Sequence, residues 1–166
     1  MQNVAERIDY KRSHFHCGRC MIEHYRKLEN MYLSAPVNQS MDIEVTISDR
    51  ETTIIQGIKP EHCHSAGALH GNYYFKCLDD ACYFAASSIN LEFFVLTVDF
   101  HIRLLRPVTP ALKYIKAQGK VVSSTKRLII CEGILWDSKD REIARGTGSF
   151  MPGKGRLTDL PGYHKD

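Results

Sequence analysis

The sequence predicts an α+β fold in which one long, curved antiparallel β-sheet wraps around a single central helix. The first reason is a segment of about eighteen residues after Gly71 that lacks both Gly and Pro and is apolar on nearly every side. Such a helix is enclosed by protein rather than laid on a surface. The second reason is that segments in which apolar and polar residues alternate lie before and after it. The third is that the later strands are joined by short turns, which makes them antiparallel neighbours.

Length and composition are those of one ordinary globular domain. The chain has 166 residues, of which 43% are hydrophobic and 25% charged, and its net charge is +3. This mild charge does not predict a nucleic-acid-binding surface, and no apolar run is long enough to cross a membrane. The first residues lack the layout of a signal peptide, so we expect the six cysteines to be reduced thiols in a cytoplasmic protein.

Residues 1–40 are predicted to be a helical extension of the domain. Within residues 4–34 apolar side chains recur at helical spacing, and the helix stops before Pro36. The sequence leaves open whether this extension serves oligomerisation or covers a pocket. It also holds the one cluster that resembles a metal site, formed by His14, His16, Cys17, Cys20 and His24. Because no second Cys pair lies at zinc-finger or zinc-ribbon spacing, we predict a helix start rather than a metal centre, with zinc binding as the alternative.

The main domain is predicted to span residues 41–152, where the apolar pattern changes to a period of two. The predicted strands are residues 42–48, 52–58, 93–105, 111–123, 127–137 and 141–151. In the long third strand, the apolar residues are expected to face one way; they are Leu96, Val98, Phe100, Ile102 and Leu104. An exposed sheet edge would favour dimerisation. Residues 153–166 are polar and rich in Gly and Pro, and we predict a loose tail there.

The central helix contains one unusual acid. Asp79 falls into an apolar stripe that also holds Phe75 and Cys82. Its neighbour Asp80 points about 100° away, toward Lys76, which suits a solvent-exposed acid. A lone carboxylate on an apolar stripe is a candidate functional group, and an ion-paired surface acid is the alternative.

Four short motifs, in this order and at this spacing, resemble the hotdog-fold acyl-CoA thioesterases, and the PaaI-type (phenylacetate-pathway) branch fits best. The first two are Gly67-x-Leu69-His70-Gly71 and Leu78-Asp79-x-Ala81. The others are Thr97-Val98-Asp99-Phe100 with Leu105-Arg106-Pro107, and the late-strand run Ala144-Arg145-Gly146-Thr147-Gly148. The resemblance covers residues 41–151, so the N-terminal extension lies outside it.

The resemblance implies a catalytic set of His70, Gly71, Asp79 and Thr97. In that family a histidine begins the central helix and the glycine after it presents its N–H to the thioester carbonyl, which places that role at Gly71. A free N–H at the positive end of a helix suits a developing oxyanion. The family's acid lies nine residues after the histidine, which selects Asp79, supplied by the partner subunit as general base or nucleophile. His70 is expected to hydrogen-bond at the turn, and Thr97 to orient the attacking water.

Two positions depart from the family pattern and are candidates for substrate contact, with a place in a surface loop as the equal alternative for His64. Asn72 stands where the motif has a second glycine, so it adds a side chain at the helix entrance. Asn tolerates unusual backbone angles, and its amide can narrow the pocket or bind the thioester oxygen. His64 stands where relatives often have a carbonyl-polarising Asn, and an imidazole can donate the same hydrogen bond.

The function predicted from these residues is hydrolysis of an acyl-CoA to a free acid and coenzyme A. The resemblance implies no metal or organic cofactor, and a homodimer that assembles into a dimer of dimers. The main alternative is an acyl-CoA-binding module that has kept the pocket and lost the reaction. A hydratase or dehydratase of the same fold ranks lowest, because the sequence lacks an Asp-x-Asn-Pro-x-x-His run. Nothing in the sequence identifies the acyl group.

Overall fold

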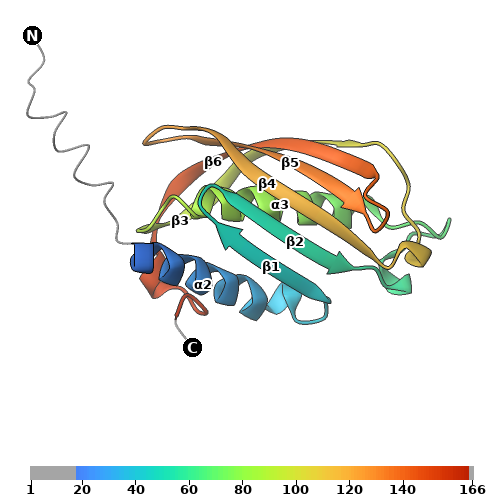
Figure 1. Cartoon of the computed structure of the whole chain (residues 1–166), viewed down its shortest axis with the longest axis horizontal. Coiled ribbons are helices and arrows are strands. Elements are labelled where there is room, and N and C mark those ends of the chain that lie inside the picture. The colour runs from blue at the N-terminus through green and yellow to red at the C-terminus, as the bar shows by residue number, and fades with distance from the viewer. Residues whose placement is uncertain (1–17, 165–166) are drawn as a thin grey trace, which may run out of the picture.

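The computed structural model describes residues 18–164 (Figure 1). Its two helices are α2 (Gly18–Ser34) and α3 (Gly71–Ser87). The strands are β1 (Ile43–Ser48), β2 (Glu51–Gly57), β3 (Phe93–Leu104), β4 (Tyr114–Ser124), β5 (Ile129–Asp137) and β6 (Glu142–Arg156). Four short 3₁₀ turns connect them: η1 (Pro36–Asn38), η2 (Pro60–His62), η3 (Pro110–Leu112) and η4 (Leu157–Asp159). Neither helix is long and apolar enough to cross a membrane.

The strands form one six-stranded sheet in the order β1-β2-β4-β5-β6-β3, and every neighbouring pair is antiparallel. Helix α3 lies against one face of this sheet (Figure 1). Its buried side includes Tyr74, Leu78, Ala81 and Ala85, as the apolar pattern of the sequence predicts. The predicted α+β class, with a long antiparallel sheet around one central helix, is therefore confirmed.

Two glycines allow α3 to lie very close to the sheet. Gly119 of β4 and Gly133 of β5 are paired across the two central strands. A Cβ atom at Gly119 would lie 2.3 Å from the carbonyl oxygen of Ala81, and one at Gly133 would lie 2.9 Å from the Sγ atom of Cys82. Any side chain at Gly119 would thus collide with the helix backbone. These positions fix the depth of α3 in the curved sheet, and with it the place of Asp79.

Helix α2 covers the β1 edge of the sheet (Figure 1). Leu28 and Tyr32 of this helix are buried in the core. The buried Glu29 turns its carboxylate toward the strand, and its Oε1 accepts the backbone N–H of Ile47 at 2.8 Å. An N–H on the outer edge of β1 is satisfied in this way without a further strand. The predicted helix is thus present from Gly18 to Ser34, while residues 4–17 of that prediction lie outside the described part.

The end of the chain differs from the predicted loose tail. Strand β6 continues five residues past the predicted end at 151, to Arg156, and Leu157 is fully buried. The hydroxyl of Tyr163 lies 2.7 Å from Nδ1 of His24 in α2. A few apolar and aromatic side chains therefore hold residues 153–164 against the rest of the protein. The sequence prediction missed them because the stretch is polar on average.

Strand β3 departs from its predicted apolar face. The pairing with β6 shifts register between Thr97 and Asp99, where Val98 is the extra residue of an irregularity. Leu96, Val98 and Leu104 are about half exposed, at 47%, 54% and 54%. The reason is the position of β3: it is the last strand of the sheet, and no described segment covers its outer side.

Candidate active site

The N-terminus of α3 is built as a capped turn. His70 is the N-cap in extended conformation, and its Nδ1 accepts the backbone N–H of Asn72 at 3.3 Å. The side-chain oxygen Oδ1 of Asn72 lies 2.9 Å from the same Nδ1, which donates to this oxygen in the tautomer that carries the proton on Nδ1. His70 thus supports the turn, as expected, and Asn72 is fixed beside the helix entrance.

Gly71 is the first residue of α3. Its N–H precedes the hydrogen-bonded part of the helix, and among residues 18–164 no acceptor is recorded for it. The nearest atom to a Cβ built on Gly71 is Cδ1 of Leu104, at 3.5 Å. This N–H therefore lies at the positive end of the helix dipole, close to the end of the open strand β3.

Asp79 lies about two turns further along α3, and its side chain faces β3. Its Oδ1 accepts the hydroxyl of Thr97 at 3.3 Å. Burial raises the pKa of Asp79 to about 6, and the charge of Asp80 adds to this, while Thr97 and Lys76 act in the opposite direction. A carboxyl group with this pKa is a better proton acceptor than an ordinary aspartate and is still mostly ionised at neutral pH.

Gly71 and Asp79 of one protomer are too far apart to act on one carbonyl group. They are eight residues apart in one helix, which separates them by about 12 Å along its axis. Groups that act on the same reacting centre need to lie within hydrogen-bond reach of it. A site that uses both residues therefore needs a second copy of the chain.

A cavity of about 390 Å³ lies beside Asp79 and Thr97. Its walls come from α2, the η1 turn, α3 and the start of β3. The lining residues are Met31, Tyr32, Ala35, Val37, Asn38, Lys76, Asp79, Asp80, Tyr83, Phe84, Phe94, Val95, Leu96 and Thr97. Asp79 is thus a half-buried acid at the wall of a cavity whose other surface is largely apolar.

Asp80 is not the solvent-facing acid that the helix pattern predicts. Its Oδ2 accepts Nζ of Lys76 at 2.5 Å and the hydroxyl of Tyr32 at 2.9 Å. The four-residue spacing of Lys76 and Asp80 is a signal that sequence reasoning can use for the ion pair. Tyr32 belongs to another helix and lies 48 positions away, so no local pattern indicates its contact.

His64 does not line the cavity beside Asp79. It is exposed in the loop before α3, and its Nδ1 accepts the backbone N–H of Ala66 at 3.1 Å. The histidine that sequence reasoning missed is His62, which is buried and stacks on Tyr73 with ring centroids 4.3 Å apart. Burial lowers the pKa of His62. Of the predicted residues, the structure groups His70, Gly71 and Asn72 at one end of α3 and Asp79 with Thr97 further along it.

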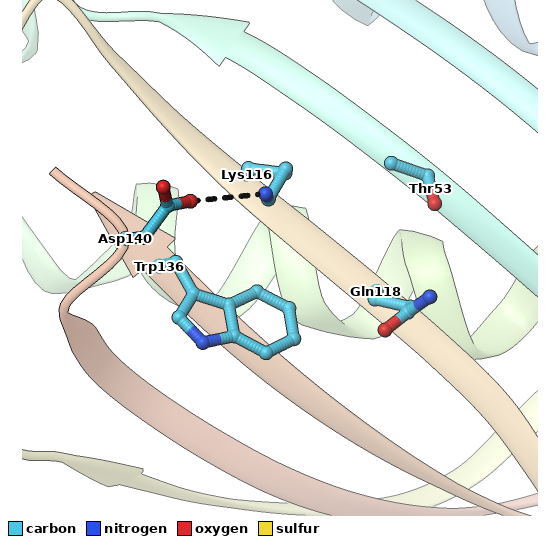
Figure 2. Close-up of a pocket in the computed structure, with 5 residues that line it drawn as sticks. All are labelled: Thr53, Lys116, Gln118, Trp136 and Asp140. Atoms are coloured by element: carbon cyan, nitrogen blue, oxygen red, sulfur yellow. Dashed lines mark hydrogen bonds and ion pairs between the residues drawn. The ribbon is translucent and has the colours of Figure 1, made fainter. Parts of the chain in front are cut away.

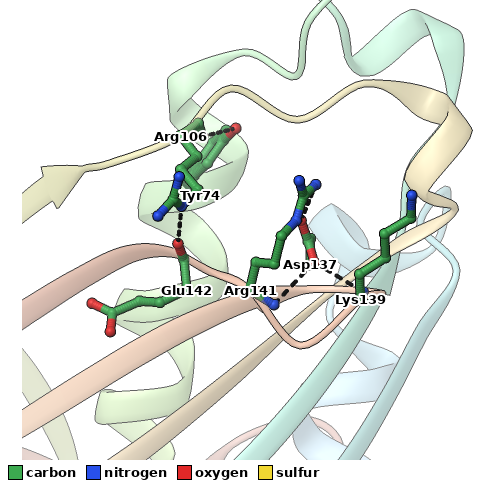
Figure 3. Close-up of polar contacts among 6 residues, drawn as sticks. All are labelled: Tyr74, Arg106, Asp137, Lys139, Arg141 and Glu142. Carbon is green, nitrogen blue, oxygen red and sulfur yellow. Dashed lines mark hydrogen bonds and ion pairs between the residues drawn. The ribbon is translucent and has the colours of Figure 1, made fainter.

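The loop and sheet end near the start of α3 are fixed by polar contacts (Figure 3). Tyr74 donates its hydroxyl to the carbonyl oxygen of Arg106 at 3.1 Å, and Nε of Arg106 donates to the carbonyl oxygen of Glu142 at 3.2 Å. The buried Asp137 accepts Nε of Arg141 at 2.8 Å. Burial opposes its ionisation, but the hydrogen bonds from Arg141 and from the backbone of Lys139 outweigh this and lower the pKa of Asp137. This acid is therefore structural.

A second cavity, of about 350 Å³, lies on the outer face of the sheet (Figure 2). Two of its lining residues, Lys116 and Gln118, alternate along β4 with the buried Ile115 and Ala117, and the others are Thr53, Trp136 and Asp140. The one acid in it, Asp140, is already paired with Lys116 at 3.2 Å. It has no free acid or base to react with a substrate, so the cavity at Asp79 is the candidate active site.

The predicted His and Cys cluster gives no metal centre within the described part of the chain. His14, His16 and Cys17 lie outside it. Cys20 is exposed, and His24 is buried with its Nε2 donating to the carbonyl oxygen of Ser87 at 3.0 Å. Among residues 18–164 no three His, Cys, Asp or Glu side chains are placed to hold a metal ion.

Comparison with known proteins supports the resemblance seen in the sequence. Residues 66–144 match a family model described as the thioesterase superfamily. The PaaI protein of the phenylacetic acid degradation operon of E. coli is 14% identical, with a TM-score of 0.73 over 82% of this chain and 97% of that one. A thioesterase family protein from Silicibacter pomeroyi is 23% identical, with a TM-score of 0.72 over 78% and 99% of the two chains. A search of curated protein sequences finds no significant match.

A third similar structure is a hypothetical thioesterase protein from Streptococcus pneumoniae, solved as a variant in which an aspartate is replaced by alanine. It is 14% identical, with a TM-score of 0.62 over 69% of this chain and 92% of that one. A second variant of the same protein, with a threonine replaced by alanine, has the same TM-score.

Proposed function

We propose, for a chain that matches the thioesterase superfamily in its central part and has the hotdog fold of PaaI-type proteins, that it hydrolyses the thioester of an acyl-CoA. One observation carries the proposal. Asp79 is a half-buried carboxylate with a raised pKa, hydrogen-bonded by Thr97 at the wall of a largely apolar cavity. An aspartate and a threonine are also the residue types that were replaced in the S. pneumoniae thioesterase.

In the proposed reaction Asp79 accepts a proton from a water molecule that Thr97 helps to orient. The water oxygen attacks the thioester carbonyl carbon, and the negative charge that forms on the carbonyl oxygen is stabilised by the N–H of Gly71. When the tetrahedral species collapses, the carbon–sulfur bond breaks and the coenzyme A thiol leaves with the proton from Asp79. Direct attack of the Asp79 carboxylate on the carbonyl carbon is the alternative first step.

The proposed active unit is a homodimer in which Gly71 of one protomer and Asp79 of its partner face the same thioester. The spacing of about 12 Å within one helix supports this arrangement, because the two groups of one protomer cannot reach the same carbonyl group. The open edge of β3 supports it, because Thr97 of that strand contacts Asp79 and Leu104 of the same strand lies beside Gly71. Pairing of two β3 strands would bring opposite ends of two α3 helices together. A dimer of dimers is a further proposal that rests on the family resemblance alone.

The test is thiol release from short, medium, long and aryl acyl-CoAs, measured for the parent protein and for Asp79→Asn. We expect kcat to fall by about a hundredfold or more in the variant, on the scale of a lost general base. Asp140→Asn on the outer face of the sheet is the matched control, and it should keep the parent rate. Unchanged turnover in Asp79→Asn would overturn the assignment.

One observation favours a second candidate, a module that binds acyl-CoA without hydrolysing it. The side chain of Asn72 contacts the ring of His70 at the entrance of α3, where the family motif has glycine. In this case acyl-CoA raises the melting temperature of the parent protein while no thiol appears. Asn72→Gly would then be the variant to assay, because it removes the side chain from the helix entrance.

A further inference from the structure

We propose that helix α2 and the η1 turn after it form the specificity-determining wall of the Asp79 cavity, and that this wall selects uncharged, apolar acyl groups of limited length. The inference rests on the proposed function, since it names the substrate class of the same site. It concerns a part of the chain that lies before the segment matched by the family model, residues 66–144.

The cavity has one wall from the sheet and α3, and one wall from the N-terminal extension. The second wall is formed by five side chains within residues 31–38, namely Met31, Tyr32, Ala35, Val37 and Asn38. Three of these are apolar. Opposite them, Phe84 of α3 and Phe94 and Leu96 of β3 add apolar surface. An acyl group that enters the cavity from Asp79 would thus lie between α2 and β3 and bury its surface against both.

The wall is held in place by hydrogen bonds to two other elements, α3 and β1. The hydroxyl of Tyr32 donates to Asp80 of α3 at 2.9 Å, and Nε2 of His24 donates to the carbonyl oxygen of Ser87 at 3.0 Å. Glu29 accepts the N–H of Ile47 in β1 at 2.8 Å. The η1 turn is tied back to the helix, because Nδ2 of Asn38 donates to the carbonyl oxygen of Tyr32 at 2.7 Å. A wall fixed on several sides discriminates by size, since it does not yield to a longer chain.

The charges in the cavity exclude an acyl group with a terminal carboxylate. Asp79 and Asp80 both line the cavity, and the one cation in its lining, Lys76, is already paired with Asp80. A second carboxylate on the substrate would lose its hydration and face two acids without a free partner. The preferred acyl groups are therefore alkyl or aryl groups without charge.

The experiment compares kcat/KM over a series of saturated acyl-CoAs from acetyl to palmitoyl for the parent and two wall variants. Met31→Ala enlarges the cavity, and we expect it to raise the ratio of long-chain to short-chain kcat/KM by about tenfold or more, the scale of a methylene-sized change in an apolar pocket. Ala35→Leu narrows the cavity and should lower the ratio of kcat/KM for the longest accepted chain to kcat/KM for acetyl-CoA by a similar factor. Leu33→Ala, an exposed residue of α2 that does not line the cavity, is the control and keeps the parent ratio.

A matched pair of substrates tests the charge. Hexanoyl-CoA and adipyl-CoA have six-carbon acyl groups, and only the second ends in a carboxylate. We expect the parent protein to prefer hexanoyl-CoA by at least about tenfold, on the same scale of pocket discrimination. Equal kcat/KM values for the two would overturn this part of the proposal.

A binding measurement separates the wall from the proposed reaction. Calorimetric titration of Asp79→Asn with the same acyl-CoAs reports the chain-length preference without turnover, and melting curves establish that each variant is folded. Wall substitutions that are folded and leave both the kinetic and the binding preference unchanged would overturn the inference. If the parent releases no thiol but Met31→Ala in the Asp79→Asn background still shifts the binding preference, the proposed hydrolysis fails and the wall stands.

Discussion

The two edges of the sheet are treated in opposite ways. At the β1 edge, α2 lies along the strand and the carboxylate of Glu29 accepts the N–H of Ile47. At the β3 edge no described segment lies beside the strand, which is twelve residues long and leaves Leu96, Val98 and Leu104 half exposed. An exposed apolar edge strand is a template for pairing with another chain. The chain thus closes one edge with its own helix and leaves the other open, and the open edge is the one proposed to pair with a second copy.

A buried or half-buried carboxylate lies near each edge, and the two carboxylates differ in how many of their hydrogen-bonding positions are occupied. Glu29 is fully engaged, because it accepts one backbone N–H and pairs with Arg26 at 3.1 Å. Asp79 has a single hydroxyl donor, Thr97, and faces a cavity. The acid at the closed edge is therefore structural, while the acid near the open edge is available for chemistry. The predictions that follow test this difference.

The largest effect is expected at the open edge. Val98→Lys places a charge on β3 at its irregularity, and charged side chains are a device by which edge strands avoid pairing. We expect the protein to become monomeric and to lose about a hundredfold or more in kcat, as for loss of the general base, because Gly71 and Asp79 can no longer meet. Sedimentation velocity and thiol release measure both effects. Thr46→Lys on β1 is the control, and a variant Val98→Lys that stays dimeric and active would contradict the assignment of this edge.

At the closed edge we expect a loss of stability. Glu29→Ala leaves the N–H of Ile47 without its acceptor, which should lower the free energy of unfolding by about 1–3 kcal/mol. The melting temperature then falls by about 2–4 °C for each kcal/mol in a chain of this size. Thermal denaturation followed by circular dichroism checks this. Glu29→Gln keeps an acceptor oxygen and should lose less than Glu29→Ala; an equal loss would show that the charge, and not the hydrogen bond, matters there.

The acid at the open edge should determine the pH dependence of activity. As general base, Asp79 must be ionised, so kcat/KM should be half-maximal near its pKa of about 6, reach a plateau at higher pH and fall about tenfold for each pH unit well below the pKa. Asp80→Asn removes a charge that raises this pKa and should move the midpoint to lower pH. A pH profile of hydrolysis measures both. A midpoint that is identical in the two proteins would mean that Asp79 is not the titrating group.

The smallest predicted effect is a gain in stability when Asp79, the proposed general base, is replaced. The pKa of Asp79 rises from 3.8 to about 6 on folding, so the folded protein binds this proton more tightly than the unfolded chain. The stability that the proton contributes is fully present below about pH 4 and is lost as pH rises through about 6. Asp79→Asn avoids this loss. Because the group is partly exposed to solvent, we expect a gain of only about 2–4 °C in melting temperature at pH 8, and none at pH 4.

Much of the fold follows from local patterns in the sequence. The breaker-free segment after Gly71 predicts α3, and alternation predicts the strands to within a few residues at most ends. Asp79 is identified by its place on an apolar stripe, and the structure puts it at a cavity with Thr97. These features are local, because they depend on the spacing of residues within one element.

Contacts between distant segments were not predictable in this way. The pairing of Tyr32 with Asp80 and of Tyr163 with His24 joins residues from elements far apart in the chain. The apolar pattern of β3 predicts a buried face, but the position of the strand at the edge of the sheet leaves that face partly exposed. Alternating apolar residues show which face of a strand can be buried, but not which segment buries it. For β3 the segment that buries this face is proposed to belong to a second chain.

The hydrogen bonds that hold α2 in place also have a consequence for folding during synthesis. The helix emerges from the ribosome before every group that holds it: Ile47 follows Glu29 by 18 positions, Asp80 follows Tyr32 by 48, and Tyr163 follows His24 by 139. An isolated helix of 17 residues is only marginally stable in water. The nascent α2 therefore presents Leu28 and Tyr32 to solvent or to chaperones until the hairpin and α3 have been made, and its last contacts close only when Tyr163 and His164 arrive.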